Sequence, residues 1–233
     1  MEVIGHRGAA AFAPENTLES IAAALSAGAD GVEIDVRMSS DGVLVLMHDP
    51  DVARTTNGTG RVAELTGSAL GALVPPVPLL DEVFATVPRD ALLVLELKGH
   101  PWEAGYDPAE PVAHALAAAL VADGERRVVV SSFNPLGLGV IRTESPGVRT
   151  AVLTSEAFDL GSNLAAAVDG GHEECHVPGT LADAAFVTRA HEAGKRVVAW
   201  TVNDPDRLRE LAAAGVDAAI TDDPRTAIAT LRY

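Results

Sequence analysis

The chain places two histidines, three carboxylates and two cationic side chains at the ends of segments that are otherwise apolar. These residues are His6, Arg7, Glu33, Asp35, His48, Glu96 and Lys98. Buried carboxylates are costly unless they are paired or bound to a metal. Histidines beside them can exchange protons near neutral pH. The set therefore predicts a site that holds a divalent metal and cleaves a phosphate ester.

The spacing of the acids predicts how they are presented. Glu33 and Asp35 are two residues apart in an apolar segment, so on a strand both point to one face while Ile34 points to the other. Glu96 and Lys98 repeat this spacing in a later segment. Three carboxylates without a cysteine-rich set favour a hard ion, Mg²⁺ or Ca²⁺, over Zn²⁺. The alternative is a set of structural salt bridges at the rim of the fold.

The remaining charged residues fit an acid–base mechanism. His6 and His48 each follow an apolar segment, and as a pair they predict that one accepts a proton from the nucleophile while the other protonates the leaving oxygen. Arg7 and Lys98 would hold phosphate oxygens and offset charge in the transition state. For both cations the alternative is structural, a rim salt bridge for Arg7 and pairing with a neighbouring acid for Lys98.

Three weaker signals lie elsewhere in the chain. Trp200 ends an apolar segment and is interpreted as packing against the organic part of a substrate, with core packing as its alternative. Asn16, three residues before Glu19, predicts a capping box at a helix start and not a ligand. Residues 172–176 combine histidines, acids and Cys175 without a standard zinc spacing, so we expect loop and strand-end roles, with His176 able to reach the site from its strand.

Two kinds of segment must position these residues. Short β-branched segments occupy residues 3–4, 31–36, 43–47, 92–97, 128–132, 148–153, 196–202 and 218–221. Ala- and Leu-rich segments with helical spacing occupy residues 17–27, 108–122, 181–193 and 204–214. Apolar strands alternating with amphipathic helices indicate a parallel sheet with helices outside. The count fits an α/β fold of the (β/α)8 TIM-barrel type, which typically has about 250 residues. A doubly wound open sheet is the alternative, weakened by the lack of a glycine-rich dinucleotide motif.

The pattern predicts a single domain over residues 1–233. A hairpin-like turn is expected near residues 40–42. The least regular stretch, residues 50–78, contains Asn57-Gly58 and several prolines. We interpret it as a short loop excursion above the barrel, after the second strand region, and not as a second domain.

Composition excludes some functions and locations. Lys and Arg number 17 against 33 Asp and Glu, a net charge of −16, which argues against nucleic-acid binding through the general surface field. A metal and local cations can still reverse the sign inside a cleft. The single Cys175 suits a reducing compartment. The N-terminus lacks a signal-peptide pattern and no apolar run approaches about 18 residues, so we expect a cytoplasmic protein without stable membrane insertion. The oligomeric state stays open.

The motifs, in this order, resemble those of the glycerophosphodiester phosphodiesterase family. They are H-R-G at 6–8, P-E-N-T at 14–17, G-A-D-G-V-E-I-D-V at 28–36, D-G-V-L-V-L-M-H-D at 41–49, R-T-T-N-G-T-G at 54–60, L-E-L-K at 95–98, S-S-F-N at 131–134, W-T-V-N at 200–203 and I-T-D-D-P at 220–224. The resemblance runs from Gly5 to the C-terminus, with no departure at the core positions.

The resemblance implies a role for each matching residue. His6 and His48 would be acid and base, and Arg7 and Lys98 would contact the phosphate. Glu33, Asp35 and Glu96 would bind one divalent cation, Mg²⁺ or Ca²⁺. It also implies a TIM-type barrel with its site at the C-terminal ends of the strands. The short excursion suggests an open site and a small soluble substrate.

The implied reaction converts a glycerophosphodiester into sn-glycerol 3-phosphate and an alcohol. Attack by the neighbouring glycerol hydroxyl, through a cyclic phosphate, and direct attack by water would use the same residues, and either histidine can act first. A lysophospholipase D-like activity is a second reading, but it needs an apolar channel for which the excursion offers little material. A non-catalytic barrel that binds a phosphorylated ligand is the third.

Overall fold

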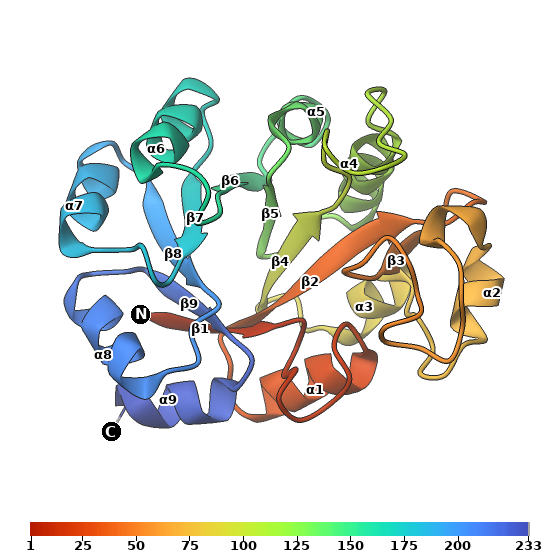
Figure 1. Cartoon of the computed structure of the whole chain (residues 1–233), viewed down its shortest axis with the longest axis horizontal. Coiled ribbons are helices and arrows are strands. Elements are labelled where there is room, and N and C mark those ends of the chain that lie inside the picture. Colours follow the sequence, from red (N-terminus) through yellow and green to blue (C-terminus); the bar gives the residue numbers. More distant parts are fainter. Residues whose placement is uncertain (233) are drawn as a thin grey trace.

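The structure is a computed structural model that describes residues 1–232, in which eight parallel strands close into a barrel with helices around it (Figure 1). The strands are β1 (Glu2–His6), β2 (Gly31–Met38), β4 (Leu92–Leu97), β5 (Val128–Ser132), β6 (Arg149–Leu153), β7 (Glu174–Pro178), β8 (Arg196–Trp200) and β9 (Ala218–Thr221). Strand β1 pairs with β2 on one side and with β9 on the other, which closes the ring. The predicted TIM barrel is confirmed.

Helices connect successive strands on the outside of the barrel. They are α1 (Leu18–Ser26), α3 (Leu80–Thr86), α4 (Pro111–Asp123), α5 (Pro135–Glu144), α6 (Leu160–Asp169), α7 (Ala184–Glu192), α8 (Pro205–Ala213) and α9 (Pro224–Arg232). Side chains cap several of their first turns, as Thr17 does for α1 and Asp204 does for α8. These caps begin α1 and α8 directly after the loops that precede them.

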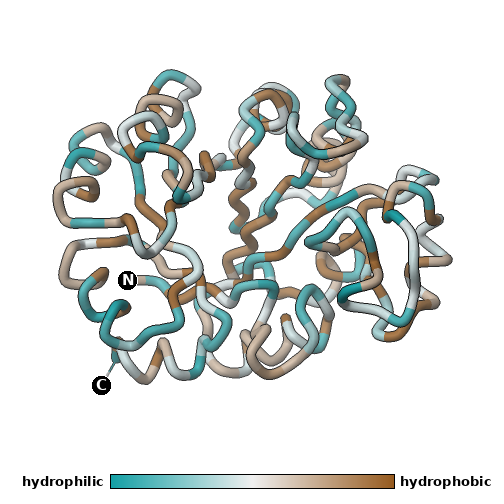
Figure 2. The backbone as a smooth tube through the Cα atoms, viewed as in Figure 1, coloured by the Kyte–Doolittle hydropathy of each residue, from teal (hydrophilic) through white to brown (hydrophobic). Residues whose placement is uncertain are grey.

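Alternation along the strands separates two apolar layers. On β4, Leu93, Leu95 and Leu97 are buried in the layer beneath the helices. The intervening Leu92 and Val94 belong to the barrel interior. Figure 2 shows apolar residues concentrated along the central strands, with hydrophilic residues on the connecting loops. The interior therefore contains an apolar layer, with polar side chains at the C-terminal ends of the strands and ion pairs of Glu174 with Arg149 and Arg196 at the N-terminal ends.

Two details differ from the sequence-based expectation. Residues 43–47 were expected as a barrel strand, but their core, β3 (Leu44–Leu46), is antiparallel to β2 and lies outside the closed ring. It forms the hairpin expected near residues 40–42. Strand β7 takes the open place in the barrel and was not among the expected strands, because its Glu174 and His176 interrupt the apolar signal.

The segment between β3 and α3 contains short helical elements, η1 (Val62–Glu64) and α2 (Gly67–Gly71). It has a small apolar cluster of its own, to which Val52, Leu70 and Val77 contribute. In Figure 1, α2 lies outside the ring of strands. Among residues 1–232, none of the helices is both long and apolar enough to cross a bilayer.

Candidate active site

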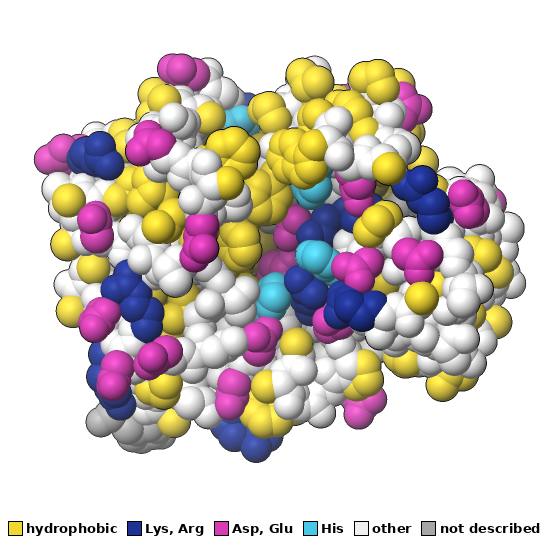
Figure 3. Space-filling view, in the orientation of Figure 1, with side chains coloured by type: hydrophobic (Ala, Val, Ile, Leu, Met, Phe, Trp, Pro, Cys, Tyr) yellow, Lys and Arg dark blue, Asp and Glu magenta, His cyan; other side chains and the backbone are white. Residues whose placement is uncertain are grey.

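The strand register brings the predicted residues together at the C-terminal end of the barrel. His6 is the register partner of Glu33 on β2. Asp35 is the register partner of Glu96 on β4. Figure 3 shows acidic, basic and histidine side chains gathered around a hollow near the centre of this face. Parallel pairing thus places side chains from distant parts of the sequence at one edge.

The three acids form a cluster that could hold a metal ion. Glu33, Asp35 and Glu96 each offer a carboxylate oxygen, and these oxygens lie within 4.8 Å of one another. Oxygens on opposite sides of a Ca²⁺ ion lie about 5 Å apart, since each Ca–O distance is about 2.5 Å. Within the described residues, Glu33 Oε1 is buried without a hydrogen-bond partner. The donor set and this unpaired oxygen fit a hard divalent cation.

The close approach of the three carboxylates and their burial shift the pKa values of Glu33 and Asp35. Burial and the neighbouring charge of Asp35 raise the pKa of Glu33 to about 8. The pKa of Asp35 is held below its usual range, because the charges of Lys98 and Arg7 outweigh the effect of burial. Glu33 therefore needs a proton, or a cation in its place, to be accommodated at neutral pH.

Both predicted phosphate contacts are already paired in the structure. Lys98, only 5% exposed, lies 2.8 Å from Asp35 Oδ1 and 2.5 Å from Glu96 Oε1. Arg7 Nε lies 3.3 Å from Asp35 Oδ2, and Nη1 donates to Glu15 Oε1 over 2.7 Å. The structural alternatives named for these two cations are thus present. Both cations lie beside the carboxylate cluster, so they can pair with these acids and still contact a bound phosphate.

Asn16 was expected to be a helix cap, and this expectation was wrong. Thr17 caps α1 and forms the capping box with Ser20. Asn16, with a left-handed φ of 56°, turns into the site, where Nδ2 donates to Asp35 Oδ2 over 2.7 Å and Oδ1 accepts from the backbone N–H of Asp35. Asn16 therefore orients a carboxylate of the cluster.

His6 is held by an aspartate from the other end of the chain. Its Nδ1 donates to Asp222 Oδ1 over 2.6 Å, and Asp222 Oδ2 accepts from Asn203 Nδ2 over 2.5 Å. Burial acts to lower the pKa of His6, but the bond to Asp222 and the charge of Glu33 outweigh it and raise this pKa. The engaged Nδ1 leaves Nε2 of His6 for proton transfer.

His48 is held through a chain of ion pairs that reaches Arg7. Its Nδ1 donates to Asp49 Oδ1 over 2.7 Å. Arg54 donates to Asp49 through Nε and forms a two-pronged pair with Glu15 through Nη1 and Nη2. Glu15 in turn accepts from Arg7. Burial and the charge of Lys98 lower the pKa of His48, so the two histidines are shifted in opposite directions.

Two hollows are each bordered by residues of the predicted site. One of about 550 Å³ is bordered by His48 and by the aromatic rings of Trp102, Phe133 and Phe158. The other, of about 400 Å³, is bordered by Trp200 and by the polar residues Ser155, Thr180 and Thr201. Trp200 also borders a small space that it shares with His6, Glu33, Glu96 and His176. His176, expected to reach the site from its strand, borders this space from β7.

Sequence reasoning missed the residues that hold the predicted ones. Asp222, Asp49 and Glu15 each pair with a member of the predicted set, and Arg54 pairs in turn with Asp49 and Glu15. Asp49 and Asp222 stand in the motifs as polar residues just after apolar segments, which is the signal that could have drawn attention to them. Arg54 and Glu15 lie in loops, and nothing in their spacing indicates that they meet.

A family model described as the glycerophosphoryl diester phosphodiesterase family matches residues 6–226. The chain belongs to this family. A glycerophosphodiester phosphodiesterase from Caldanaerobacter subterraneus subsp. tengcongensis is 30% identical, over 99% of this chain and 97% of the relative. The chain is thus an enzyme that hydrolyses phosphoric diesters.

Solved structures agree with the family in sequence and in fold. An Oleispira antarctica phosphodiesterase, solved in complex with the product sn-glycerol-3-phosphate, is 27% identical with a TM-score of 0.90, covering all of this chain and 97% of that one. A glycerophosphodiester phosphodiesterase from Thermotoga maritima is 29% identical with a TM-score of 0.77, covering 96% and 95% of the two chains. The family's barrel is thus matched over almost the whole chain.

Proposed function

We propose that the chain hydrolyses glycerophosphodiesters to sn-glycerol 3-phosphate and an alcohol, with one divalent cation, Mg²⁺ or Ca²⁺, and with His6 and His48 as acid and base. The observation that carries this proposal is the carboxylate cluster with its unpaired Glu33 oxygen beside His6, whose Nδ1 is bonded to an aspartate. Family membership and the product bound by the Oleispira relative support the choice of substrate.

The cluster accounts for what a cation would add. Glu33, Asp35 and Glu96 would hold the ion, which when bound supplies Lewis acidity to the phosphate and to the attacking oxygen. Lys98 neutralises charge on Asp35 and Glu96, and Arg7 does so on Asp35. In this proposal both cations would lie next to the place where negative charge develops on phosphorus-bound oxygens.

The histidines move the protons. One ring accepts the proton of the attacking hydroxyl through Nε2, while the other donates a proton to the departing alcohol. When a cyclic phosphate is formed first, the roles reverse as water opens it. Asp222 and Asp49 keep both rings in the tautomer that leaves Nε2 free. Trp200, whose buried Nε1 has no partner within the described residues, would donate to a substrate oxygen.

The test is release of glycerol 3-phosphate from a panel of glycerophosphodiesters, with and without added metal. We expect EDTA to abolish release, and Mg²⁺ or Ca²⁺ to restore it. Full activity after exhaustive chelation would rule out the metal role. Binding of glycerol 3-phosphate without turnover of any diester would instead favour a barrel that only binds phosphorylated ligands.

We also propose that residues 1–233 act as one domain, with residues 50–78 as an excursion. The excursion's apolar cluster includes Val45 of β3, so it packs on the barrel's own hairpin. A cytoplasmic location stays a prediction, which cell fractionation would check.

A further inference from the structure

The hollow beside His48 has a wall of aromatic rings. His100 and Trp102 stack with centroids 5.0 Å apart. Phe133 meets His100 edge-on at 5.3 Å and Trp200 edge-on at 6.0 Å. Trp102 is 64% exposed and Phe158 is 55% exposed, although both border the hollow. Figure 3 shows apolar side chains gathered along the upper rim of this face. Large exposed aromatic groups beside a catalytic histidine indicate a binding surface.

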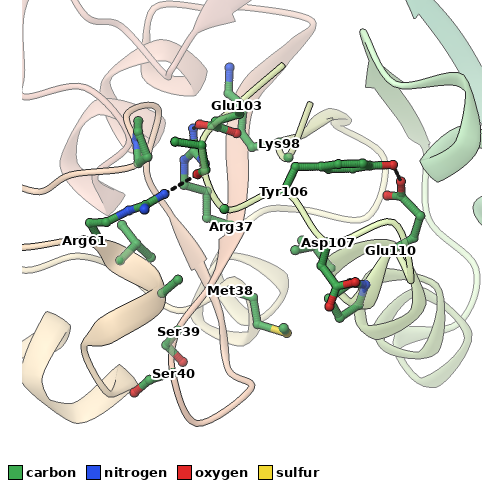
Figure 4. Close-up of a pocket in the computed structure, with 18 residues that line it drawn as sticks. Arg37, Met38, Ser39, Ser40, Arg61, Lys98, Glu103, Tyr106, Asp107 and Glu110 are labelled. Carbon is green, nitrogen blue, oxygen red and sulfur yellow. Dashed lines mark hydrogen bonds and ion pairs between the residues drawn. The ribbon is translucent and has the colours of Figure 1, made fainter. Parts of the chain in front are cut away.

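The loop that carries His100 and Trp102 is held in place before any ligand binds. Arg37 Nη2 donates to Glu103 over 2.7 Å, and Arg61 donates to the carbonyl oxygen of Ala104. Farther along, the Tyr106 hydroxyl donates to Glu110. Figure 4 shows these pairs around a neighbouring hollow of about 290 Å³. Arg37 and Glu103 border both hollows, so their pair forms part of the partition between them. A fixed aromatic wall loses little conformational entropy on binding.

The charges around the aromatic hollow are already neutralised. Glu103 is paired with Arg37, Asp49 with Arg54, and Lys98 with two carboxylates. A cationic headgroup would find no free carboxylate among these lining residues. His100 and Trp102 also cover one face of each other, instead of standing apart as the walls of a cage around a cation. The hollow therefore suits an apolar group.

We propose that this hollow binds the alcohol part of the diester and selects alcohols that carry an alkyl chain, with Trp102 and Phe158 as the residues that determine specificity. This inference rests on the proposed function. The glycerol part carries free hydroxyl groups in every glycerophosphodiester, and it matches the other hollow, whose lining includes Ser155, Thr180 and Thr201. The Thr180 hydroxyl donates to Glu156, which also borders this hollow. Among glycerophosphodiesters only the alcohol part differs in polarity from one compound to another. The alcohol is therefore the part that can be apolar enough to bind in the aromatic hollow.

The test compares glycerophosphodiesters whose alcohol is ethanol, butanol, hexanol, ethanolamine or choline. Hexyl has four more methylenes than ethyl, and full burial of each would raise kcat/KM about fourfold. With only part of the chain buried, we expect kcat/KM to rise by about tenfold or more from ethyl to hexyl. Trp102→Ala and Phe158→Ala should each reduce this rise, so that the ratio of kcat/KM for hexyl to kcat/KM for ethyl becomes smaller. Phe12→Ala is the matched control, since Phe12 is 47% exposed but packs under Arg225, outside the hollow, and should keep the ratio.

Several outcomes would overturn the inference while the proposed function survives. One is a kcat/KM that stays the same from ethyl to hexyl in the unmodified enzyme. Another is a higher kcat/KM for the choline diester than for the hexyl diester. A third is a hexyl-to-ethyl ratio of kcat/KM that does not change in Trp102→Ala. A gain seen only when the chain is attached to glycerol, as in a lysophospholipid, would also overturn it. Calorimetric binding of hexyl phosphate against ethyl phosphate repeats the comparison without turnover. Equal affinities there would contradict the inference even if no diester is hydrolysed.

Discussion

At the residue scale, the two histidines define the expected loss of activity. We predict that His6→Ala and His48→Ala each lower kcat/KM for a glycerophosphodiester by about 10²-fold or more, because each removes a proton-transfer group. Steady-state assays of glycerol 3-phosphate release measure this. His191→Ala is a suitable control, since His191 is a surface histidine that also pairs with an aspartate, Asp217. Near-normal activity in His6→Ala or in His48→Ala would contradict the acid–base role of that histidine.

Asp222 should set the position of one limb of the pH profile. The raised pKa of His6 and the lowered pKa of His48 predict a bell-shaped profile, in which the pair carries one proton between the two values. The same bell-shaped profile is expected whichever histidine acts first, because the profile reports the pKa values of the pair and not of each ring separately. Asp222→Asn weakens the hydrogen bond that raises the pKa of His6, so the alkaline limb should move to lower pH.

The control for this shift is Asp217→Asn, which removes the corresponding partner of the surface residue His191. Its profile should match that of the unmodified enzyme. An alkaline limb that stays in place in Asp222→Asn would mean that His6 does not govern it.

The sequence predicted the residues that cluster at the candidate site, but not the residues that hold them in place. His6, Glu33 and Glu96 are visible because polar groups are unusual in apolar strands. Asn16 was mistaken for a cap because an asparagine before a helix has that role far more often. The pairing of Glu15 with Arg54 joins residues 39 apart in two loops, and loop geometry has no sequence period from which it could be read.

At the scale of elements, Arg54 links the excursion to the loop between β1 and α1. It bridges Asp49, which holds His48, and Glu15, which holds Arg7. We predict that Arg54→Ala lowers kcat/KM by about tenfold, since small displacements of catalytic groups reduce rates strongly. Steady-state kinetics together with circular dichroism would measure the loss in a folded protein.

Arg209→Ala provides the comparison, because Arg209 forms a single exposed pair with Asp206 on α8. It should leave kcat/KM as it was. Equal effects of the two substitutions would show that the Arg54 bridge does not position the site.

Element type was predictable where the pattern was long and uniform. Helices α1, α4, α7 and α8 fall within or close to the expected segments. Helices α3, α5, α6 and α9 lie outside the expected segments. In α5 and α6, glycines weaken the helical pattern. Strand β3 looked like a barrel strand because all of its residues are buried, yet pairing direction is set by the short turn at residues 40–42 and not by burial.

At the scale of the whole molecule, the acid cluster should couple metal binding to stability. The pKa of Glu33 is raised from 4.5 to about 8, so the folded chain binds this proton more tightly than the unfolded chain. Its stabilisation is complete below pH 4.5 and fades as the pH rises through about 8. In metal-free protein, Glu33→Gln should therefore reduce the fall in unfolding temperature over this range.

Added Mg²⁺ or Ca²⁺ should raise the unfolding temperature more at pH 8 than at pH 5, because the cation replaces the proton. Thermal denaturation monitored by circular dichroism gives both results. Glu125→Gln, at an exposed position, serves as the control and should follow the unmodified protein. A metal effect of equal size at both pH values would contradict the coupling.

The bond between His6 and Asp222 joins residues that are 216 positions apart. During synthesis, Asp222 leaves the ribosome 216 residues after His6, and strand β9 directly precedes Asp222. Until β9 arrives, β1 lacks its neighbour on that side, and its exposed edge is open to unwanted pairing. Closure of the barrel and the pairing of His6 with Asp222 therefore occur at the same stage, once β9 and Asp222 have been made.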